Sequence, residues 1–440
     1  MVIGIRREDK NEWEARVPLT PQDIAELRNP NLQFVVQPSP IRIFKEEEYR
    51  AAGASIEEDL SCCDIILGVK EIPPQLLLPD KTYLFFSHTI KGQKYNMPML
   101  QRLLQLRDTL IDYERIVDEQ GRRLVFFGRF AGIAGMIDTF WALGQRWAAE
   151  GHSSLFDQVK RALHYHSLTE VKEDFLRLSD QIQKKGLTAV EVPCVVGFTG
   201  YGHVSTGAQE IFNLLPHQEI SPAELAQFIK QGKFSNKLLY KVVFREADLV
   251  RPKKDSDSFD LQDYYHHPDK YISRFEEYLP YLSVLINAIY WDARYPRLVT
   301  KKYLKQAYAV GLLKNLKIIG DISCDIEGSI ECTVEASTPG NPVYVYNPLT
   351  EKITYGVQGS GPVILAVDNL PCELPRDASA MFSRVLKNFI PPLAAANYQG
   401  DFDAFNIVPE LKRATIVYRG KLTPDYQYLA SYLSDFSDKT

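Results

Sequence analysis

Charged side chains follow directly after short apolar runs in the first third of the chain. These are Lys70 and Glu71 after residues 65–69, His88 after residues 84–86, and Glu114 after residues 110–113. Such runs are typical of buried parallel strands. The carboxyl ends of parallel strands share one edge, where ligands bind, so Lys70 and His88 are expected to face one cleft. A partly desolvated Lys or His can transfer protons near neutral pH. A single charge there would only mark the point where the chain leaves the core. Together with the charged segment 14–21, however, these make four such clusters in one domain, which favours a functional site.

Cations gather near the same predicted strand ends. Arg16 precedes Val17-Pro18-Leu19, Lys91 follows His88 by three residues, and Arg122 and Arg123 form a pair further along. A guanidinium fork suits a carboxylate, and an unpaired buried cation is costly. A surplus of cations therefore predicts a substrate that carries several carboxylates.

A second kind of site is predicted around residue 200. The apolar run 192–198 leads into Thr199-Gly200-Tyr201-Gly202-His203-Val204-Ser205-Thr206-Gly207 and then into a helical pattern. A strand, a tight glycine turn and a helix N-terminus together are typical of a dinucleotide pyrophosphate site. Gly200 would allow the turn, Gly202 would admit the phosphates, and Gly207 would let helix and strand pack closely. Ser205 replaces the usual third glycine.

These sites require an α/β fold with two sheets. Strand candidates in the first sheet are residues 2–5, 33–36, 65–69, 84–86, 110–113 and 124–127, and those of the second are 192–198, 218–220, 240–244, 283–289, 317–322 and 364–367. Residues 131–149 predict a buried helix, and residues 151–190 predict an amphipathic helix that stops at Gly186. Residues 251–273 are rich in charge, Tyr and His, and are interpreted as a lid-like loop.

The composition of the chain argues against several classes of protein. The net charge of -5 argues against nucleic acid as a partner. No apolar stretch is long enough to span a membrane, and the start of the chain, Met1 to Arg7, reaches charged residues at once and lacks the apolar core of a signal peptide. The 6 cysteines lack metal-ligand spacing. His164, His166, His266 and His267 also lack it, so no metal site is predicted. The thiols and the missing leader predict a cytoplasmic location.

The motifs resemble a known family. Several segments look like the lysine-ketoglutarate reductase half of the bifunctional lysine-catabolic enzyme. They are residues 5–9 with 16–21, 67–70, Phe86-Ser87-His88-Thr89-Ile90-Lys91, 121–123, 202–212, and 368–371 with 374–375. They are similar, more distantly, to lysine-forming saccharopine dehydrogenases and alanine dehydrogenase. The resemblance runs nearly end to end. No second catalytic half follows Thr440, so a free-standing version is expected.

The resemblance implies two Rossmann-like lobes with parallel sheets and an active-site cleft between them. The first lobe would comprise residues 1–133 completed by 372–440, and the cofactor lobe residues 134–371. The implied reaction condenses L-lysine with 2-oxoglutarate and reduces the imine to saccharopine. The family places the acid/base pair on Lys70 and His88. It places substrate contacts on Arg16, Lys91 and Arg123, with charge tuning by Glu71 and Glu114.

The expected cofactor-binding residues are Gly200, Gly202, His203, Val204, Ser221, Ile286, Asn287 and Asp368, together with Asp321 or Asp325. NADP(H) is the expected cofactor and NAD(H) the alternative, because Ser221 stands where NAD-dependent enzymes carry an acidic residue. A shift of two residues would put Glu219 there instead. Two other functions stay open: reductive amination or opine synthesis with another amine, and a non-catalytic cofactor-binding regulator. Homo-oligomerisation also stays open.

Overall fold

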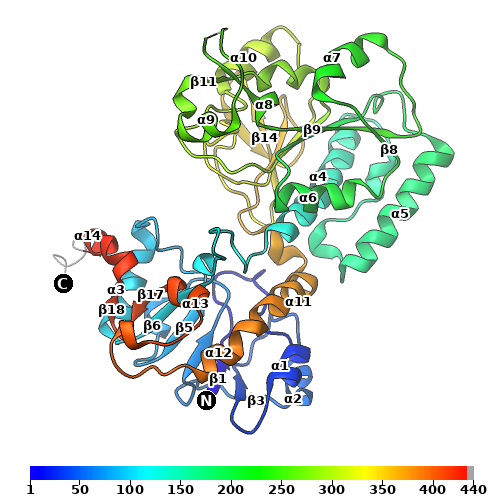
Figure 1. The fold of residues 1–440 in the computed structure, drawn as a ribbon. Helices are drawn as coiled ribbons and strands as arrows, with labels where there is room; N and C mark the ends of the chain where they lie inside the picture. The colour runs from blue at the N-terminus through cyan, green and yellow to red at the C-terminus, as the bar shows by residue number, and fades with distance from the viewer. Residues whose placement is uncertain (255, 434–440) are drawn as a thin grey trace. The chain divides into compact units, whose positions relative to one another are not determined.

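The computed structural model describes residues 1–254 and 256–433, and these fold into two compact units. The first comprises Met1–Phe127 and Pro375–Thr440, and the second comprises Gly128–Leu374 (Figure 1). Each unit is built on one eight-stranded sheet. Among the described residues, no helix combines the length and the apolar composition needed to cross a bilayer.

The sheet of the first unit has the strand order β18-β17-β6-β5-β4-β1-β2-β3. Its strands are β1 (Val2–Ile5), β2 (Gln33–Val36), β3 (Ser55–Ile56), β4 (Ile65–Leu67), β5 (Thr82–Phe85), β6 (Thr109–Asp112), β17 (Thr415–Tyr418) and β18 (Lys421–Leu422). The strands β1 to β6 are parallel, whereas β17 pairs antiparallel with β6. One edge of the sheet therefore collects the carboxyl ends of all six parallel strands.

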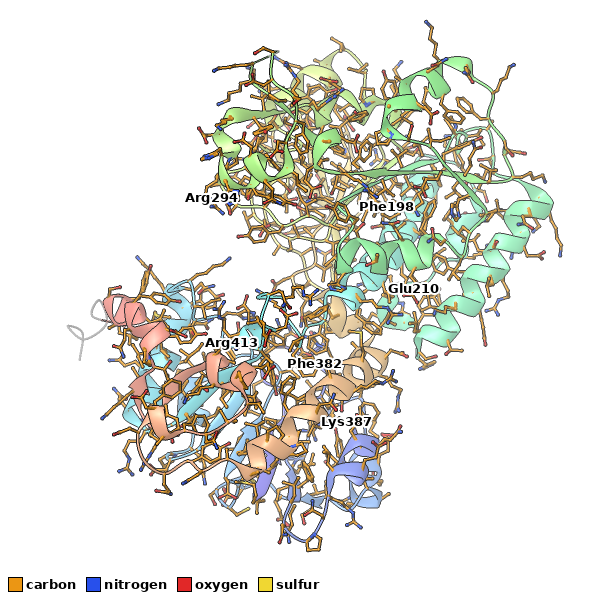
Figure 2. The ribbon with its side chains drawn as sticks, viewed as in Figure 1. Phe198, Glu210, Arg294, Phe382, Lys387 and Arg413 are labelled. Carbon is orange, nitrogen blue, oxygen red and sulfur yellow. The ribbon has the colours of Figure 1, made fainter. Side chains whose placement is uncertain are left out.

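The C-terminal segment completes this unit. Its helix α11 (Pro375–Leu386) is fixed to the loop before helix α1 (Pro21–Leu27): the amides of Val17 and Thr20 donate to the hydroxyls of Ser379 and Ser383, each at 2.9 Å. Phe382 of α11 lies among buried aromatic rings (Figure 2). The remaining helices of the unit are α2 (Glu46–Ala51), α3 (Met97–Gln105), α12 (Ile390–Ala395), α13 (Pro409–Ala414) and α14 (Ala430–Leu433).

The second unit has the strand order β15-β14-β16-β13-β12-β7-β9-β8. Its strands are β7 (Val195–Thr199), β8 (His217–Glu219), β9 (Leu239–Phe244), β12 (Val284–Asn287), β13 (Ile318–Asp321), β14 (Val343–Asn347), β15 (Lys352–Tyr355) and β16 (Val363–Leu365). The hairpin β14–β15 adds an antiparallel edge to an otherwise parallel sheet. Its helices are α4 (Gly128–Ala149), α5 (Leu168–Lys185), α6 (His203–Phe212), α7 (Pro222–Gln231), α8 (Glu246–Leu249), α9 (Leu261–His266) and α10 (Lys301–Ala309).

Two sequence predictions are wrong at this level. Residues 124–127 form no strand, and Phe127 instead stacks on Phe382 with ring centroids 4.4 Å apart. Residues 251–273 are not a simple loop. Their ends form the antiparallel pair β10 (Val250–Pro252) and β11 (Tyr271–Ser273), and Tyr264 and Tyr271 are buried in the core of the second unit. Two of the three tyrosines of this excursion are therefore packing residues, whereas Tyr265 is exposed.

The helices α4 and α6 approach each other through glycine. A Cβ atom on Gly132 would lie 1.9 Å from the carbonyl oxygen of Val204, and one on Gly207 would lie 2.1 Å from that of Arg129. The sequence-based role of Gly207, close packing of helix on strand, is therefore wrong. Gly207 allows a close helix–helix contact, and this contact fixes the start of α6, the helix that follows the glycine turn.

Gly132→Ala should destabilise the protein strongly, because only a backbone shift can relieve an overlap with a carbonyl oxygen. We expect the free energy of unfolding to fall by about 2 kcal/mol or more, which is in the upper part of the range observed for overpacked sites. Gly202→Ala is the matched control, since no atom lies within 4 Å of a Cβ there. Urea unfolding of both variants measures the difference. Equal stability of Gly132→Ala and wild type would contradict this account of the helix pair.

Candidate active site and cofactor site

The predicted acid/base residues occupy equivalent places on neighbouring strands of the first unit. Strands β4 and β5 pair in parallel, with Leu67 opposite Leu84. Lys70 is the third residue after the end of β4, and His88 is the third after the end of β5. Both residues therefore lie at the carboxyl edge of one sheet, as the spacing of the apolar runs predicts.

Buried groups hold the backbone at both positions. The fully buried Glu8 carboxylate accepts hydrogen bonds from the amides of Val69 (2.7 Å) and Lys70 (2.9 Å). His88 has a left-handed backbone, with a φ of 48°, and its carbonyl accepts from the Asn96 side chain at 3.2 Å. A left-handed histidine costs conformational energy, and such strain is concentrated at functional sites.

The imidazole of His88 is oriented by Glu71. Its Nδ1 lies 2.6 Å from Glu71 Oε1, and Lys10 Nζ lies 3.5 Å from the other carboxylate oxygen. Burial opposes ionisation of Glu71, but the hydrogen bond and charge of His88, together with Lys10, lower its pKa to about 2. The Glu71 carboxylate therefore accepts the Nδ1 hydrogen bond, which leaves Nε2 as the ring nitrogen available to a substrate.

A second carboxyl group fixes the loop that carries His88. The Ser87 amide and hydroxyl and the Glu114 amide all donate to Asp112, which ends β6; the first of these bonds is 3.1 Å and the last 2.7 Å. Burial raises the pKa of Asp112 to about 6 despite these hydrogen bonds. The sequence places Asp112 with Glu114 in a charged cluster at a predicted strand end, but no role for Asp112 was predicted from it.

The predicted substrate arginines already have carboxylate partners. Arg16 forms a buried, two-pronged pair with Glu14 (2.7 and 2.6 Å), and its guanidinium lies 4.2 Å over the Phe127 ring. Arg123 pairs with Glu114, and Arg122 pairs with Asp118 at 2.7 Å. Lys91 is exposed in the loop after His88. The predicted surplus of cations is therefore wrong, because local acidic residues neutralise the three arginines.

Glu71→Gln should remove an acid-sensitive contribution to stability. Because the folded-state pKa of Glu71 lies below its ordinary value of 4.5, its contribution is present above pH 4.5 and is lost as the pH falls towards 2. The shift corresponds to about 3 kcal/mol. Unfolding free energies between pH 6 and pH 2.5 should therefore fall less in Glu71→Gln than in wild type. The exposed residue Glu12 supplies the control Glu12→Gln, and equal acid sensitivity of all three proteins would contradict the prediction.

The glycine turn of the second unit has the geometry of a dinucleotide site. Gly200 is left-handed, with a φ of 78°, and its amide donates to the carbonyl of Phe244 at 3.0 Å. Gly202 precedes α6, where His203 and Val204 form the first turn, and open space surrounds its Cα. A helix N-terminus that follows a backbone without a side chain is the arrangement that binds a pyrophosphate.

The other predicted cofactor residues fall into two groups. Ile286, Asn287 and Asp321 have no exposed surface. The Asn287 side chain accepts from Thr199 and donates to Asp321, each at 2.8 Å, and burial raises the pKa of Asp321. This network joins the ends of β7, β12 and β13. Asp325 and Asp368 are exposed, so Asp325 is the one of the two candidate aspartates that a ligand can reach.

The argument for Ser221 assumed that β8 lies beside β7, and this assumption is wrong. β8 is the edge strand, and β9 lies between it and β7. The residues that follow β9 are Arg245 and Glu246. The Arg245 guanidinium lies 5.3 Å over the ring of Tyr201 in the glycine turn, and Glu246 accepts from the hydroxyls of Tyr201 (3.2 Å) and Tyr265 (2.7 Å).

No group of three His, Cys, Asp or Glu side chains able to hold a metal occurs within the part of the chain that the structure describes. The thiols at positions 62, 63, 194, 324, 332 and 372 form no disulfide among these residues.

Comparisons with known proteins define the family. Residues 4–134 match the model of the alanine dehydrogenase/PNT N-terminal domain, and residues 262–425 match that of the C-terminal domain. The chain belongs to the alanine dehydrogenase/PNT family. An L-alanine dehydrogenase structure covers 98% of the chain with a TM-score of 0.60 at 17% identity, and a transhydrogenase from Sinorhizobium meliloti covers 96% with a TM-score of 0.56 at 16% identity. The predicted α/β fold with two Rossmann-like sheets is confirmed, and the matched domains indicate a pyridine-nucleotide cofactor.

Comparison with curated sequences identifies more similar proteins than the family models do. The chain is 41% identical to an α-aminoadipic semialdehyde synthase of Arabidopsis thaliana and 36% identical to a mitochondrial one of Bos taurus, each over 97% of this chain. It spans only 41% and 47% of those proteins. A saccharopine dehydrogenase [NAD(+), L-lysine-forming] of Neurospora crassa is 28% identical over 90% of this chain and 91% of its own length. The resemblance predicted from the motifs is confirmed.

Proposed function

We propose that the protein catalyses the reversible, NAD(P)H-dependent condensation of L-lysine with 2-oxoglutarate to saccharopine, as part of lysine catabolism. The observation that carries the proposal is the His88–Glu71 pair, which lies at the same sheet edge as Lys70. The names of the plant, bovine and fungal relatives support the same reaction class.

The reaction needs two proton carriers. The ε-amine of lysine attacks the keto carbon of 2-oxoglutarate, and the resulting carbinolamine must lose its hydroxyl as water to give the imine. We assign His88 Nε2 as the base that takes a proton from the attacking amine and returns it to the former keto oxygen, which becomes the carbinolamine hydroxyl, because Glu71 occupies Nδ1. We assign Lys70 to protonate the departing hydroxyl, since its ammonium form carries the proton that this step requires. The bound cofactor supplies a hydride to the imine carbon.

The residues around the glycine turn would hold that cofactor. The amides at the start of α6 bind the pyrophosphate, and Gly202 leaves room for it. The ribose of the adenosine half would reach the end of the strand beside β7, which is β9 and not β8. Arg245 offers a cation there, whereas the neighbouring carboxylate of Glu246 is already hydrogen bonded to two tyrosines. We therefore retain NADP(H) as the preferred cofactor, with Arg245 in place of Ser221 as the residue that recognises the 2′-phosphate.

Arg16, Lys91 and Arg123 are proposed to bind the carboxylates of the two substrates. Since Glu14 and Glu114 already neutralise the two arginines, a substrate carboxylate gains less from them than from unpaired cations. This pairing favours a second candidate function, reductive amination of a smaller 2-oxo acid, which places fewer carboxylates in the site.

Substrate pairs separate the two candidates. We expect clear oxidation of NADPH with L-lysine plus 2-oxoglutarate, and at least ~10-fold less with pyruvate plus ammonia, because about 1.4 kcal/mol of charge pairing is lost with the smaller acid. Each substrate alone is the control. Equal rates with pyruvate plus ammonia, or no dependence on lysine, would favour the second candidate.

A further inference from the structure

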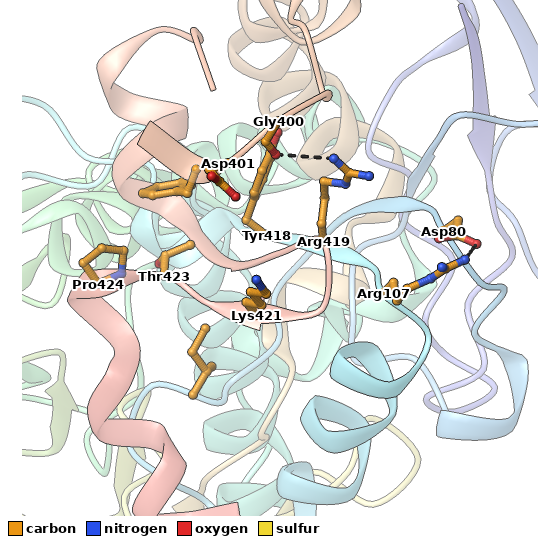
Figure 3. Close-up of a pocket in the computed structure, with 11 residues that line it drawn as sticks. Asp80, Arg107, Gly400, Asp401, Tyr418, Arg419, Lys421, Thr423 and Pro424 are labelled. Carbon is orange, nitrogen blue, oxygen red and sulfur yellow. Dashed lines mark hydrogen bonds and ion pairs between the residues drawn. The ribbon is translucent and has the colours of Figure 1, made fainter. Parts of the chain in front are cut away.

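A cavity of about 580 Å³ opens at the amino edge of the first unit's sheet. Its walls include Asp80 and Arg107, each two residues before a parallel strand, β5 and β6 respectively. His88 and Glu114 follow the carboxyl ends of the same two strands, so the cavity lies at the edge opposite the candidate active site. The rest of the lining comes from the C-terminal residues 400–402, 418, 419 and 421–424 (Figure 3).

The cavity carries three cations and two carboxylates. Arg107 pairs with Asp80 at 2.7 Å, but both side chains are well exposed, so this pair contributes little. Among the described residues, the Arg419 guanidinium donates only to a backbone carbonyl, that of Gly400 at 3.3 Å (Figure 3). Lys421 is exposed on the same hairpin, and Asp401 is the second carboxylate. Arg107 offsets the charge of Asp80, and either Arg419 or Lys421 offsets that of Asp401. The lining of the cavity therefore has a net charge of +1.

The backbone that presents Arg419 is strained. Arg419 and Gly420 join β17 to β18 as a two-residue turn, with Tyr418 paired to Lys421 and φ angles of 48° and 78°. Turns of this kind favour Asn, Asp or Gly at the first position, so an arginine costs conformational energy there. The turn therefore places a cation at the cavity in a position where Asn or Asp would cost less conformational energy. Backbone strain of this kind is concentrated at functional sites.

A buried hydroxyl also points to a missing ligand group. Tyr418 lines the cavity and is only 4% exposed, and its hydroxyl finds no hydrogen-bond partner among the described residues. Burial raises the pKa of this hydroxyl, while the charge of Arg419 acts in the opposite direction. A buried hydroxyl without a partner is costly, and a ligand oxygen would satisfy it.

We propose that this cavity binds a small organic anion that has one carboxylate or phosphate head and a flat apolar body. Arg419 and Lys421 bind the head, the Tyr418 hydroxyl donates to one of its oxygens, and Phe402 and Leu422 contact the body. Binding is non-covalent, and the site is separate from Lys70 and His88. The proposal does not depend on the reaction proposed above.

Four probes test the head and the body separately: phenyl phosphate, benzoate, inorganic phosphate and phenol. Binding to the full chain is measured by ligand-observed NMR at constant ionic strength, adjusted with chloride. The double variant Arg419→Asn/Lys421→Gln removes two cations and keeps a residue that suits the turn. Arg50→Gln, which removes an exposed cation on α2, is the matched control.

We expect phenyl phosphate or benzoate to bind wild type at least tenfold more tightly than the double variant, with Arg50→Gln and Lys70→Met unchanged. The head that binds more tightly identifies the ligand as a phosphate or a carboxylate. Inorganic phosphate and phenol should each bind more weakly than phenyl phosphate. The proposal is overturned if neither organic anion binds wild type, if the double variant binds them equally well, or if Lys70→Met abolishes binding.

Discussion

Lys70→Met and His88→Gln should each lower kcat by about 10²–10⁴-fold, the effect typical of losing a general acid or base. Each change removes a proton carrier at the carboxyl edge of the first unit, while the glycine turn and Arg245 belong to the second unit. Binding of NADPH, followed by fluorescence titration, should therefore change less than threefold. The rates come from steady-state oxidation of NADPH with lysine plus 2-oxoglutarate.

Arg50→Gln is a suitable control for these rates, because this side chain is exposed on α2. Glu71→Gln should lie between wild type and His88→Gln, since the imidazole then keeps its place but loses the carboxylate that fixes its Nδ1 proton. If the single variants Lys70→Met and His88→Gln both kept full activity, the assigned acid/base roles would be refuted.

Arg245→Ser should lower kcat/KM for NADPH by about 10-fold or more and leave that for NADH nearly unchanged. The guanidinium lies at the end of the strand beside β7, where the 2′-phosphate of NADP is bound in this kind of domain. A charge-assisted contact of this type contributes about 1.5–3 kcal/mol. Catalytic efficiencies with the two cofactors measure the effect directly.

Lys233→Ser provides a matched control, because Lys233 is an exposed cation near the edge strand β8 and not beside the glycine turn. Glu246→Gln probes the opposite specificity. A wild-type enzyme that prefers NADH tenfold, and that loses this preference in Glu246→Gln, would show that the acidic residue after β9 recognises the ribose and that the protein uses NAD(H).

Local sequence patterns predict the parallel strands well. The buried apolar runs at β1, β2, β4, β5 and β6 are each followed by polar residues, so both the strands and their ligand-binding edge follow from periodicity. The glycine turn is equally local, since Gly200 and Gly202 have conformations that their residue type allows. The strand β17 was missed, although Thr415–Tyr418 is a buried run of β-branched and aromatic residues, the same kind of signal that marks β1.

Features that depend on strand order or on pairing partners could not be predicted in this way. The exchange of β8 and β9 moves the proposed ribose-recognising position from Ser221 to Arg245, and periodicity carries no information about which parallel strands are neighbours. The pairing of Arg16 with Glu14 was a different kind of omission. Residues two apart in an extended segment point to the same side, so the sequence did contain a signal for that ion pair.

The divided first unit has a consequence for protein synthesis. A ribosome must translate the whole of Gly128–Leu374 after it has made Met1–Phe127 and before it makes the residues of β17. At about 5–20 residues per second, this leaves the nascent β6 without its edge partner for at least about ten seconds. The second unit, being continuous, can fold on the ribosome during this interval. Molecular chaperones would thus be needed mainly by the N-terminal segment, whose unpaired strand is the part of the nascent chain most exposed to aggregation.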